Sequence, residues 1–397
     1  MSDGATLISE IQALLKESGL SAWLFFDFRG SDPIAYRILG LDPASHATRR
    51  WLYLIPAEGM PTKIVHRIEA GRLDALPGEK QVYLEWTALH EILAAALNGH
   101  TKVAMQYSPR NDVPYVSKVD GGMLELIRQS GVEVVTSADL VQQFECVWDA
   151  KRLQGHRRTA NIITALVREA FELAVEQIRD QGHSDELAIQ EFIMRRLAKE
   201  ELETDFPPIV AVNQNAGNPH YGPEPAHHSS IQAESLLLID LWARHIDAES
   251  VFADITWTAW MGSSVPPRVA EVFEVVRQAR DTGVEFLNRR LARGHVVHGW
   301  EVDDAVRKVI QDKGYGEYFI HRTGHNLGHE VHGNGVNFDN LETHDNREVL
   351  PGVCCTIEPG IYLPDFGIRS EIDVFVKEDG VEVTTPPQEE LISFALD

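Results

Sequence analysis

Four acidic residues interrupt otherwise apolar stretches in the second half of the chain. They are Asp240 at the end of LLLID, Asp254 in FADITWT, Glu358 in CCTIEPG and Glu371 in IRSEIDVFV. A carboxylate among the apolar residues of a strand is costly to bury unless it is paired or bound to a metal ion. One such acid is typical of a strand end that faces solvent, but four of them together indicate a shared site.

A histidine-rich loop accompanies these acids. The segment HRTGHNLGHEVHG contains His321, His325, His329 and His332. Histidine is the commonest metal-binding side chain, and carboxylate oxygens added to one imidazole suit manganese, cobalt, iron or zinc. Two pairs of strands that each present two acids toward one centre would provide what a dinuclear metal site needs.

A compact first unit precedes the elements that must position these residues. The sequence predicts an α/β structure for this unit. An amphipathic helix is expected over 8–16, with Gly19 as its stop. Short apolar runs typical of strands lie at 22–26, 51–55, 103–105 and 132–135, with a helix expected over 122–129. This first part contains neither GxGxxG nor GxxxxGK[ST], so no phosphate-binding loop is expected there.

A long helical pattern opens the second unit near Asp149 and ends at Gly182. It suggests a domain boundary between 1–150 and 151–397, because a long helix at the start of a unit leaves few contacts to the preceding part. Further helices are expected from Ser184, over 267–293 and over 302–313. Strands are expected at 209–212, 236–239 and 251–258, and mostly strands and loops from Tyr318 onward.

Length and charge limit the class of protein. The chain has 397 residues, which at about 150 residues per domain predicts two or three domains. Its formal charge of −24 argues against a nucleic-acid or anionic-membrane surface, because the field of the protein would repel phosphate. With three cysteines, no basic and apolar leader and no apolar stretch of about 20 residues, a reduced, cytoplasmic protein is expected.

The second half of the chain resembles the M24 metallopeptidases, the pita-bread enzymes that include methionine aminopeptidase, aminopeptidase P and prolidase. The resemblance covers residues 155–395 and rests on NPHY, LLID followed by DIT, GHxxGxxxH, TIEPGIY and GIRSE, in the family order. It implies a catalytic domain with a curved, mostly antiparallel sheet. Residues 1–150 resemble the α/β N-terminal domain of the creatinase, aminopeptidase P and prolidase branch, which methionine aminopeptidase lacks.

The resemblance implies a role for each matching residue. Asp240 would chelate one metal ion, Asp254 and Glu371 would bridge both ions, and His325 and Glu358 would complete the second. Glu358 would also carry a proton from the attacking water to the leaving nitrogen. Two divalent ions per subunit are therefore expected, with manganese preferred and cobalt or zinc as alternatives.

Four more residues are expected around this centre. His220 and His332 match the outer histidines of the family, which hold substrate and steer protons. His321 matches a histidine that lines the substrate pocket, with a solvated loop histidine as the alternative. Arg369, which should share a strand face with Glu371, would orient the bridging carboxylate or bind a substrate carboxylate.

The implied function is hydrolysis of the Xaa-Pro bond of small proline-containing peptides by a metal-activated water, in a protein expected to form a homodimer. Alternatives are an aminopeptidase P that acts on longer peptides, a hydrolase of another small amide and a non-catalytic pita-bread module that binds peptides. Retention of all five ligands argues against the last alternative.

Two tryptophans depart from the family pattern. Trp242 stands where the family usually has glycine, and Trp257 stands where it has arginine. We expect Trp257 to crowd the substrate site. The long segment 332–351 would either wall off the leaving-group side or form a solvated surface loop. Both features favour dipeptides over longer substrates.

Overall fold

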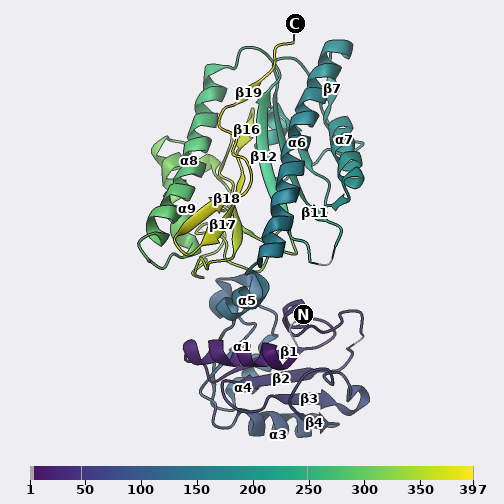
Figure 1. Cartoon of the computed structure of the whole chain (residues 1–397), viewed down its shortest axis with the longest axis vertical. Coiled ribbons are helices and arrows are strands. Elements are labelled where there is room, and N and C mark those ends of the chain that lie inside the picture. Colours follow the sequence, from purple (N-terminus) through teal and green to yellow (C-terminus); the bar gives the residue numbers. More distant parts are fainter. Residues whose placement is uncertain (1–3, 46, 248, 397) are drawn as a thin grey trace. The chain divides into compact units, whose positions relative to one another are not determined.

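The computed structural model describes residues 4–45, 47–247 and 249–396. The chain divides into two compact units, Met1–Glu145 and Cys146–Asp397 (Figure 1). In the described part of the chain, no helix is long and apolar enough to cross a membrane.

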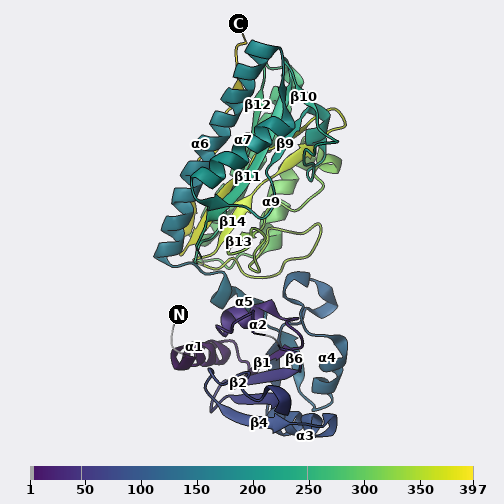
Figure 2. The ribbon, with the colours of Figure 1, turned by 90° about the vertical axis from the view of Figure 1, so that its right-hand side faces the viewer.

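The first unit contains a six-stranded mixed sheet in the order β4-β3-β2-β1-β5-β6 (Figure 2). Its strands are β1 (Ala22–Asp27), β2 (Trp51–Pro56), β3 (Thr62–His66), β4 (Glu79–Tyr83), β5 (Lys102–Met105) and β6 (Glu133–Thr136). Its helices are α1 (Gly4–Glu17), α2 (Pro33–Ile38), α3 (Trp86–Leu97), α4 (Gly121–Arg128) and α5 (Ala138–Glu145). Because strand side chains alternate, Trp23 and Phe25 pack in the core shared with α1, α2 and α5, whereas Leu24 and Phe26 pack with α3 and α4.

The second unit combines four long helices with mostly antiparallel strands. One sheet contains β8 (Leu202–Glu203), β9 (Ile209–Val212), β11 (Leu236–His245), β12 (Ala253–Trp260) and β19 (Ile392–Ser393). A second contains β13 (Asn326–Leu327), β14 (Cys354–Ile357), β17 (Ile372–Lys377) and β18 (Gly380–Val383). Two short ribbons pair β7 (Ser184–Asp185) with β10 (Ser230–Ile231) and β15 (Gly360–Tyr362) with β16 (Gly367–Arg369). The antiparallel arrangement confirms the fold class expected for the catalytic part.

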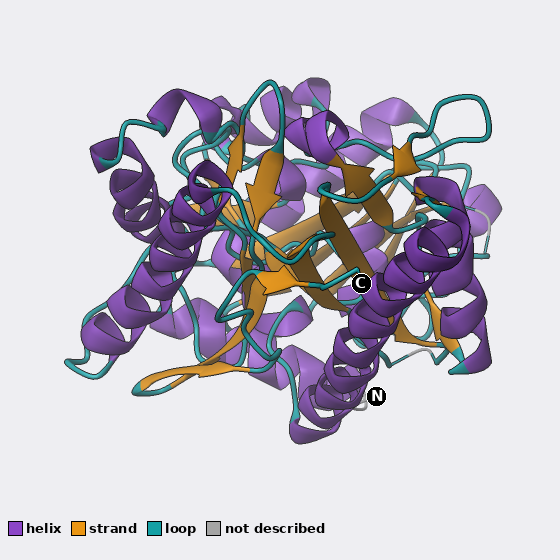
Figure 3. Cartoon of the chain, turned by 90° about the horizontal axis from the view of Figure 1, so that it is seen from above, coloured by secondary structure: helices purple, strands orange, loops and turns teal. Residues whose placement is uncertain are grey.

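The long helices lie close to the ranges that the sequence predicts, although the helix expected over 302–313 begins at Gly299 and the one expected over 267–293 ends at Leu291. They are α6 (Ala150–Gln181), α7 (Glu186–Lys199), α8 (Pro267–Leu291) and α9 (Gly299–Asp312). Asp149 caps α6 by accepting a hydrogen bond from Arg152 N at 2.8 Å, and Gly182 ends it in the left-handed region at φ 81°. Asp185 caps α7 in the same way through Leu187 N. Figure 3 shows long helices at the periphery with strands between them.

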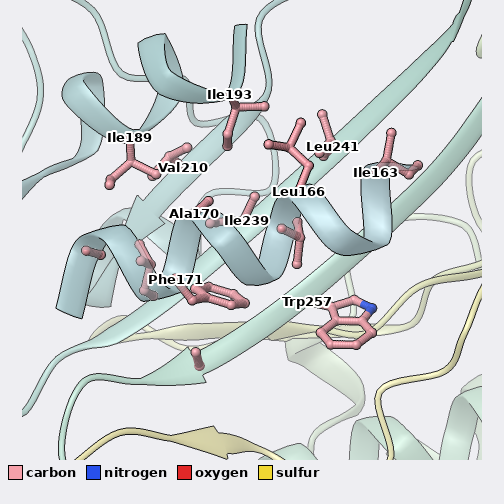
Figure 4. Close-up of a cluster of buried hydrophobic side chains, with 14 of the residues drawn as sticks. Ile163, Leu166, Ala170, Phe171, Ile189, Ile193, Val210, Ile239, Leu241 and Trp257 are labelled. Atoms are coloured by element: carbon pink, nitrogen blue, oxygen red, sulfur yellow. The ribbon is translucent and has the colours of Figure 1, made fainter. Parts of the chain in front are cut away.

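The main core of the second unit lies between α6 and the β11–β12 hairpin (Figure 4). Residues of α6 and α7 that face this hairpin include Ile163, Leu166, Ala170, Phe171, Ile189 and Ile193. Odd-numbered residues of the two strands, such as Ile239, Leu241 and Trp257, fill the same core. Strand alternation therefore directs the even-numbered residues to the opposite face of the hairpin.

The expectation that Trp257 crowds the substrate site is wrong. The side chain is 2% exposed and lies in the core under α6, with the Arg168 guanidinium 4.8 Å from the ring centre. Its neighbour Thr256 faces the opposite side of the sheet, because successive strand residues alternate. The departure from the family pattern at Trp257 thus changes core packing.

The segment 332–351 is not a solvated surface loop. Val336, Phe338 and Val349 are buried in a core that also contains Ile357 and Val374 of the second sheet. Within the segment, the Asp345 carboxylate accepts a hydrogen bond from Asn337 N at 2.8 Å. The segment is thus a folded part of the second unit.

Candidate metal centre

The β11–β12 hairpin brings the first two acids to one face. Its antiparallel register places Asp240 opposite Thr256 and Trp242 opposite Asp254. Directly opposed residues project to the same side of a sheet, and residues two apart in a strand do so as well. Asp240 and Asp254 are therefore diagonal neighbours on the face away from α6.

The second sheet supplies the other ligand-type residues. Ile357 of β14 pairs with Ile372 of β17, so Glu358 and Glu371 lie next to each other where this register continues. On the other side of β14, Thr356 N donates to His325 O at 2.9 Å. A side chain at Gly324 would place its Cβ 2.0 Å from Thr356 O, so glycine is required for this close approach.

Two hydrogen bonds donated by backbone N–H groups join the sheets at the centre. Glu371 N donates to Thr256 O at 3.2 Å, and Asp254 N donates to Asp373 Oδ2 at 3.0 Å. As a result, Asp254, His325 and Glu371 offer ligand atoms that all lie within 4.8 Å of one another. His325 Nε2 also lies 3.4 Å from Glu358 Oε1. The structure thus brings four of the five expected ligands into direct proximity, and Asp240 lies on the same hairpin face.

Burial and mutual repulsion govern the charge of these acids. Burial, together with the charges of neighbouring carboxylates, raises the pKa of Asp254 and of Glu371 well above the ordinary range. Burial raises the pKa of Glu358 to about 7. Burial also raises the pKa of Asp240, although the Arg369 guanidinium opposes the shift.

The donor set fits a divalent cation. Among the described residues, Asp254 Oδ1 is buried and has no hydrogen-bond partner. Buried acceptors without partners are rare in folded proteins, and a group of carboxylates with one imidazole is typical of transition-metal ligation. A bound cation would satisfy the orphan oxygen and remove the repulsion between the carboxylates.

Arg369 holds this group together. Its Nε donates to Thr256 Oγ1 at 2.9 Å, its Nη1 donates to Tyr362 OH at 2.9 Å, and its Nη2 pairs with Asp240. Thr256 Oγ1 in turn donates to Glu371 Oε2 at 2.7 Å. Since Arg369 is 3% exposed and every guanidinium nitrogen meets a protein group, the contacts favour its orienting role over binding of a substrate carboxylate.

His321 extends the same network. It is half-buried, with Nδ1 2.7 Å from Arg322 O and Nε2 2.6 Å from Tyr362 OH. A carbonyl can only accept, so Nδ1 carries the proton and Nε2 accepts from the tyrosine hydroxyl. Burial and nearby arginines, Arg369 foremost, lower the pKa of His321 to about 3, which keeps the ring neutral. The alternative of a solvated loop histidine does not hold.

His332 and His220 lie on the open side of the centre. Both are exposed, and the ring of His332 packs edge-on against that of His325 with centroids 4.3 Å apart. His220 lies within electrostatic range of Asp240 and His332. These positions suit side chains that meet a substrate.

Thr256 and Tyr362 belong to this network, although the sequence motifs assign neither of them a role. Both lie inside the motifs that were singled out, two residues after Asp254 and four residues after Glu358. The period of two along the strand could have identified Thr256 as a neighbour of the acids on the same face. Nothing in the sequence pattern indicates that Tyr362 links His321 to Arg369.

Comparisons with known proteins agree with this geometry. The model of metallopeptidase family M24 matches residues 155–378. An Xaa-Pro dipeptidase from Lactobacillus delbrueckii subsp. lactis is 33% identical over 223 residues, which cover 56% of this chain and 56% of that protein. The match thus spans little more than half the length of this relative.

Solved structures share the fold. Dipeptidase PepE from Mycobacterium ulcerans superposes with a TM-score of 0.72 at 22% identity, over 99% of this chain and 98% of the other. The N-terminal domain of the FACT complex subunit SPT16 from Cicer arietinum reaches 0.66 at 11% identity, over 99% of both chains. Such distant likenesses show the fold alone. The family model, which covers more than half of the sequence, establishes that the chain belongs to metallopeptidase family M24.

Proposed function

We propose that the chain is a metal-dependent exopeptidase that hydrolyses the Xaa-Pro bond, with dipeptides as preferred substrates. The observation that carries the proposal is the gathering of Asp254, His325, Glu358 and Glu371, in which Asp254 Oδ1 lacks a hydrogen-bond partner among the described residues. The named activity of the Lactobacillus relative supports the choice of substrate. All five ligand positions are retained, which disfavours a non-catalytic peptide-binding module.

We propose two divalent ions, with manganese preferred and cobalt or zinc as alternatives. Asp240 and Asp254 would hold one ion, His325 and Glu358 would hold the other, and Glu371 would join Asp254 in bridging them. Ions bound there would supply a water molecule of lowered pKa and polarise the substrate carbonyl. Carboxylate-rich ligation suits manganese.

Individual residues of the chain would take the remaining roles in catalysis and positioning. Glu358, beside the expected ions, would carry a proton from the attacking water to the nitrogen that leaves. His220 and His332, on the open side, would hold the peptide and steer its protons. Tyr362 and Arg369 keep Asp240 in place through the hydrogen bonds described above.

The substrates would be small proline-containing peptides. The protein would assemble as a homodimer. Proline contributes a tertiary amide without an N–H group, so its recognition must rely on shape and on the groups around the carbonyl. Nucleic acid is an unsuitable partner for a chain with a formal charge of −24.

Substrate length separates the proposal from its nearest rival, an aminopeptidase P. Because Trp257 lies in the core, it does not exclude longer peptides, and the preference for dipeptides rests on the relative. The test is hydrolysis of Xaa-Pro dipeptides beside matched Xaa-Pro-Xaa tripeptides by manganese-reconstituted protein. Faster turnover of tripeptides would indicate aminopeptidase P. Binding of both peptides without hydrolysis would indicate the peptide-binding module and overturn the enzyme assignment.

A further inference from the structure

Among the buried carboxylates of the second unit that lie outside the expected ligand set is Glu186. Glu186 is the first residue of α7, and its side chain is fully buried. Among the described residues, no ion pair involves this carboxylate. A buried charge without a cation is retained only where several hydrogen bonds satisfy it.

The bonds of Glu186 all come from one segment. Its Oε1 accepts from Val212 N at 2.7 Å and from Asn215 Nδ2 at 2.9 Å. Its Oε2 accepts from Tyr221 OH at 2.6 Å and from Ser229 N at 2.6 Å. These donors span the connection from the end of β9 to the start of β10. One carboxylate therefore holds both ends and the middle of this loop.

The loop between Val212 and Ser229 carries His220. Tyr221, the next residue, donates its hydroxyl to Glu186, and burial together with this carboxylate raises the pKa of Tyr221. The second half of the loop, where His220 and its neighbours are mostly exposed, has other long-range contacts at its far end, where His228 Nε2 lies 3.2 Å from Asp185 Oδ2 and Glu186 N donates to Ser229 O at 3.2 Å. The position of His220 relative to Asp240 thus depends on the bond between Tyr221 and Glu186.

The first half of the loop has an independent anchor. The 3-10 turn η4 (Asn213–Gly217) packs so closely on β16 that a Cβ at Gly367 would lie 1.8 Å from Ala216 O. A Cβ at Gly217 would lie 2.6 Å from Leu363 O. Loss of Glu186 should therefore release mainly the part of the loop that includes His220, while the strand that carries Arg369 keeps its contact with η4.

We propose that Glu186 is a positioning residue, which fixes His220 over the metal centre by holding Tyr221 and the two ends of the loop. The inference rests on the proposed function for the role of His220 in catalysis, whereas the structural part stands without it. Glu186 does not contact the expected ligands, and its effect passes through the loop.

Three variants test the proposal. Glu186→Gln keeps the shape but offers one acceptor oxygen, so at least one pair of donors loses its partner. Tyr221→Phe removes the bond to Glu186 next to His220, together with a longer bond from the same hydroxyl to His227 O at 3.4 Å, and serves as the milder variant. Glu191→Gln is the matched control, because it changes an exposed glutamate on the same helix.

Hydrogen exchange of the metal-free protein provides a readout that does not depend on activity. In Glu186→Gln, the amides of 218–229 should exchange faster than in the wild type, while those of α6 stay unchanged. In Tyr221→Phe the increase should be confined to residues near His220. Unchanged exchange over 218–229 in both variants would overturn the proposal.

Kinetics of the manganese-loaded protein on an Xaa-Pro dipeptide provide the second readout. Glu186→Gln should lower kcat by about 10²-fold, the cost of a displacement of about 1 Å, with bound metal unchanged. In a His220→Ala background the same substitution should lower kcat no further, because its effect passes through His220. An equal loss in both backgrounds would show a general structural role and overturn the proposal. An inactive wild type would refute the proposed function, and the exchange experiment would then decide the role of Glu186 alone.

Discussion

Buried carboxylates in the two units are stabilised in different ways. Asp27, at the end of β1 in the first unit, accepts hydrogen bonds from Gly30 N, Asp32 N and Tyr36 OH, each at 3.0 to 3.1 Å. Asp254, at the start of β12 in the second, faces other carboxylates and keeps an oxygen without a partner among the described residues. The first is satisfied by its own chain, whereas the second lies among ligand-type side chains that a cation would bring together. An oxygen without a partner does not by itself mark a ligand, because Asp32 Oδ2 in the first unit is also buried without a partner among the described residues. What distinguishes Asp254 is the imidazole and the carboxylate that lie beside it.

The largest effect is expected at the metal ligands. Glu371→Ala removes the carboxylate that we propose to bridge the ions and should reduce bound manganese to less than one ion per chain, with activity lowered by more than about 10²-fold. Elemental analysis and dipeptide hydrolysis measure both quantities. The free energy of unfolding measured with manganese should also fall, because an ion stabilises the folded state only to the extent that it binds it. Retention of full metal content would remove Glu371 from the ligand set.

A smaller loss is expected from a residue on the open side. His332→Ala should leave bound metal near the wild-type value and lower kcat by about 10²-fold, as for a positioned proton-transfer group. The exposed His329→Ala in the same loop is the matched control and should retain activity. If His332→Ala lost metal as Glu371→Ala does, the distinction between ligand and outer histidine would be wrong.

Loss of the hydrogen-bonded link between Arg369 and Glu371 should reduce metal binding and activity less than loss of a ligand. Thr256→Val removes the hydroxyl that accepts from the first and donates to the second, and should lower manganese affinity or activity by about 10-fold. Among the described residues, the hydroxyl of Thr282 on α8 bonds only to its own helix, so Thr282→Val should change neither. Wild-type affinity in Thr256→Val would show that Arg369 orients the ligands without this link.

The pH dependence of metal-free stability follows from the raised pKa values. The folded protein binds more protons than the unfolded chain at Asp254, Glu358 and Glu371, so their contribution is greatest at low pH and is lost as pH rises. For Glu358 the loss falls between its ordinary pKa of 4.5 and about 7. The lowered pKa of His325 acts in the opposite direction, but only below 6.5.

The thermal midpoint of chelated protein should therefore fall as the pH rises above 6.5, where His325 no longer opposes the loss, by a few degrees for each kcal/mol lost. Saturating manganese should remove this fall, because the ion favours the ionised carboxylates. A metal-free midpoint that rises over the same range would contradict the repulsion inferred at this centre.

The smallest functional effect is expected in the first unit. Asp27→Asn leaves one acceptor where three donors converge and should lower the free energy of unfolding by about 1–3 kcal/mol. Bound metal and activity per folded molecule should stay at wild-type values. A change in metal content would break the contrast between a structural acid and a ligand.

Much of the architecture could be predicted because it depends on local signals. Asp149 and Gly182 mark the ends of α6 by capping and by a left-handed conformation, which act over one helical turn. The four acids are noticeable for a similar reason, since a charged residue among strand apolars contradicts its surroundings. Their order along the chain, together with His325, was sufficient to indicate the family and a metal centre.

Other features depend on contacts between distant parts of the chain. Both faces of β12 are buried, so hydrophobicity along it does not reveal which side Trp257 occupies, and only the strand pairing and α6 decide this. The bonds of Arg369 to Asp240, and of Glu186 to the loop that carries His220, join residues that the sequence separates widely. The sequence by itself determined which side chains are present for metal chemistry, because side-chain type sets ligand character. Only the tertiary structure decided which groups hold them in place, because register and packing set the distances.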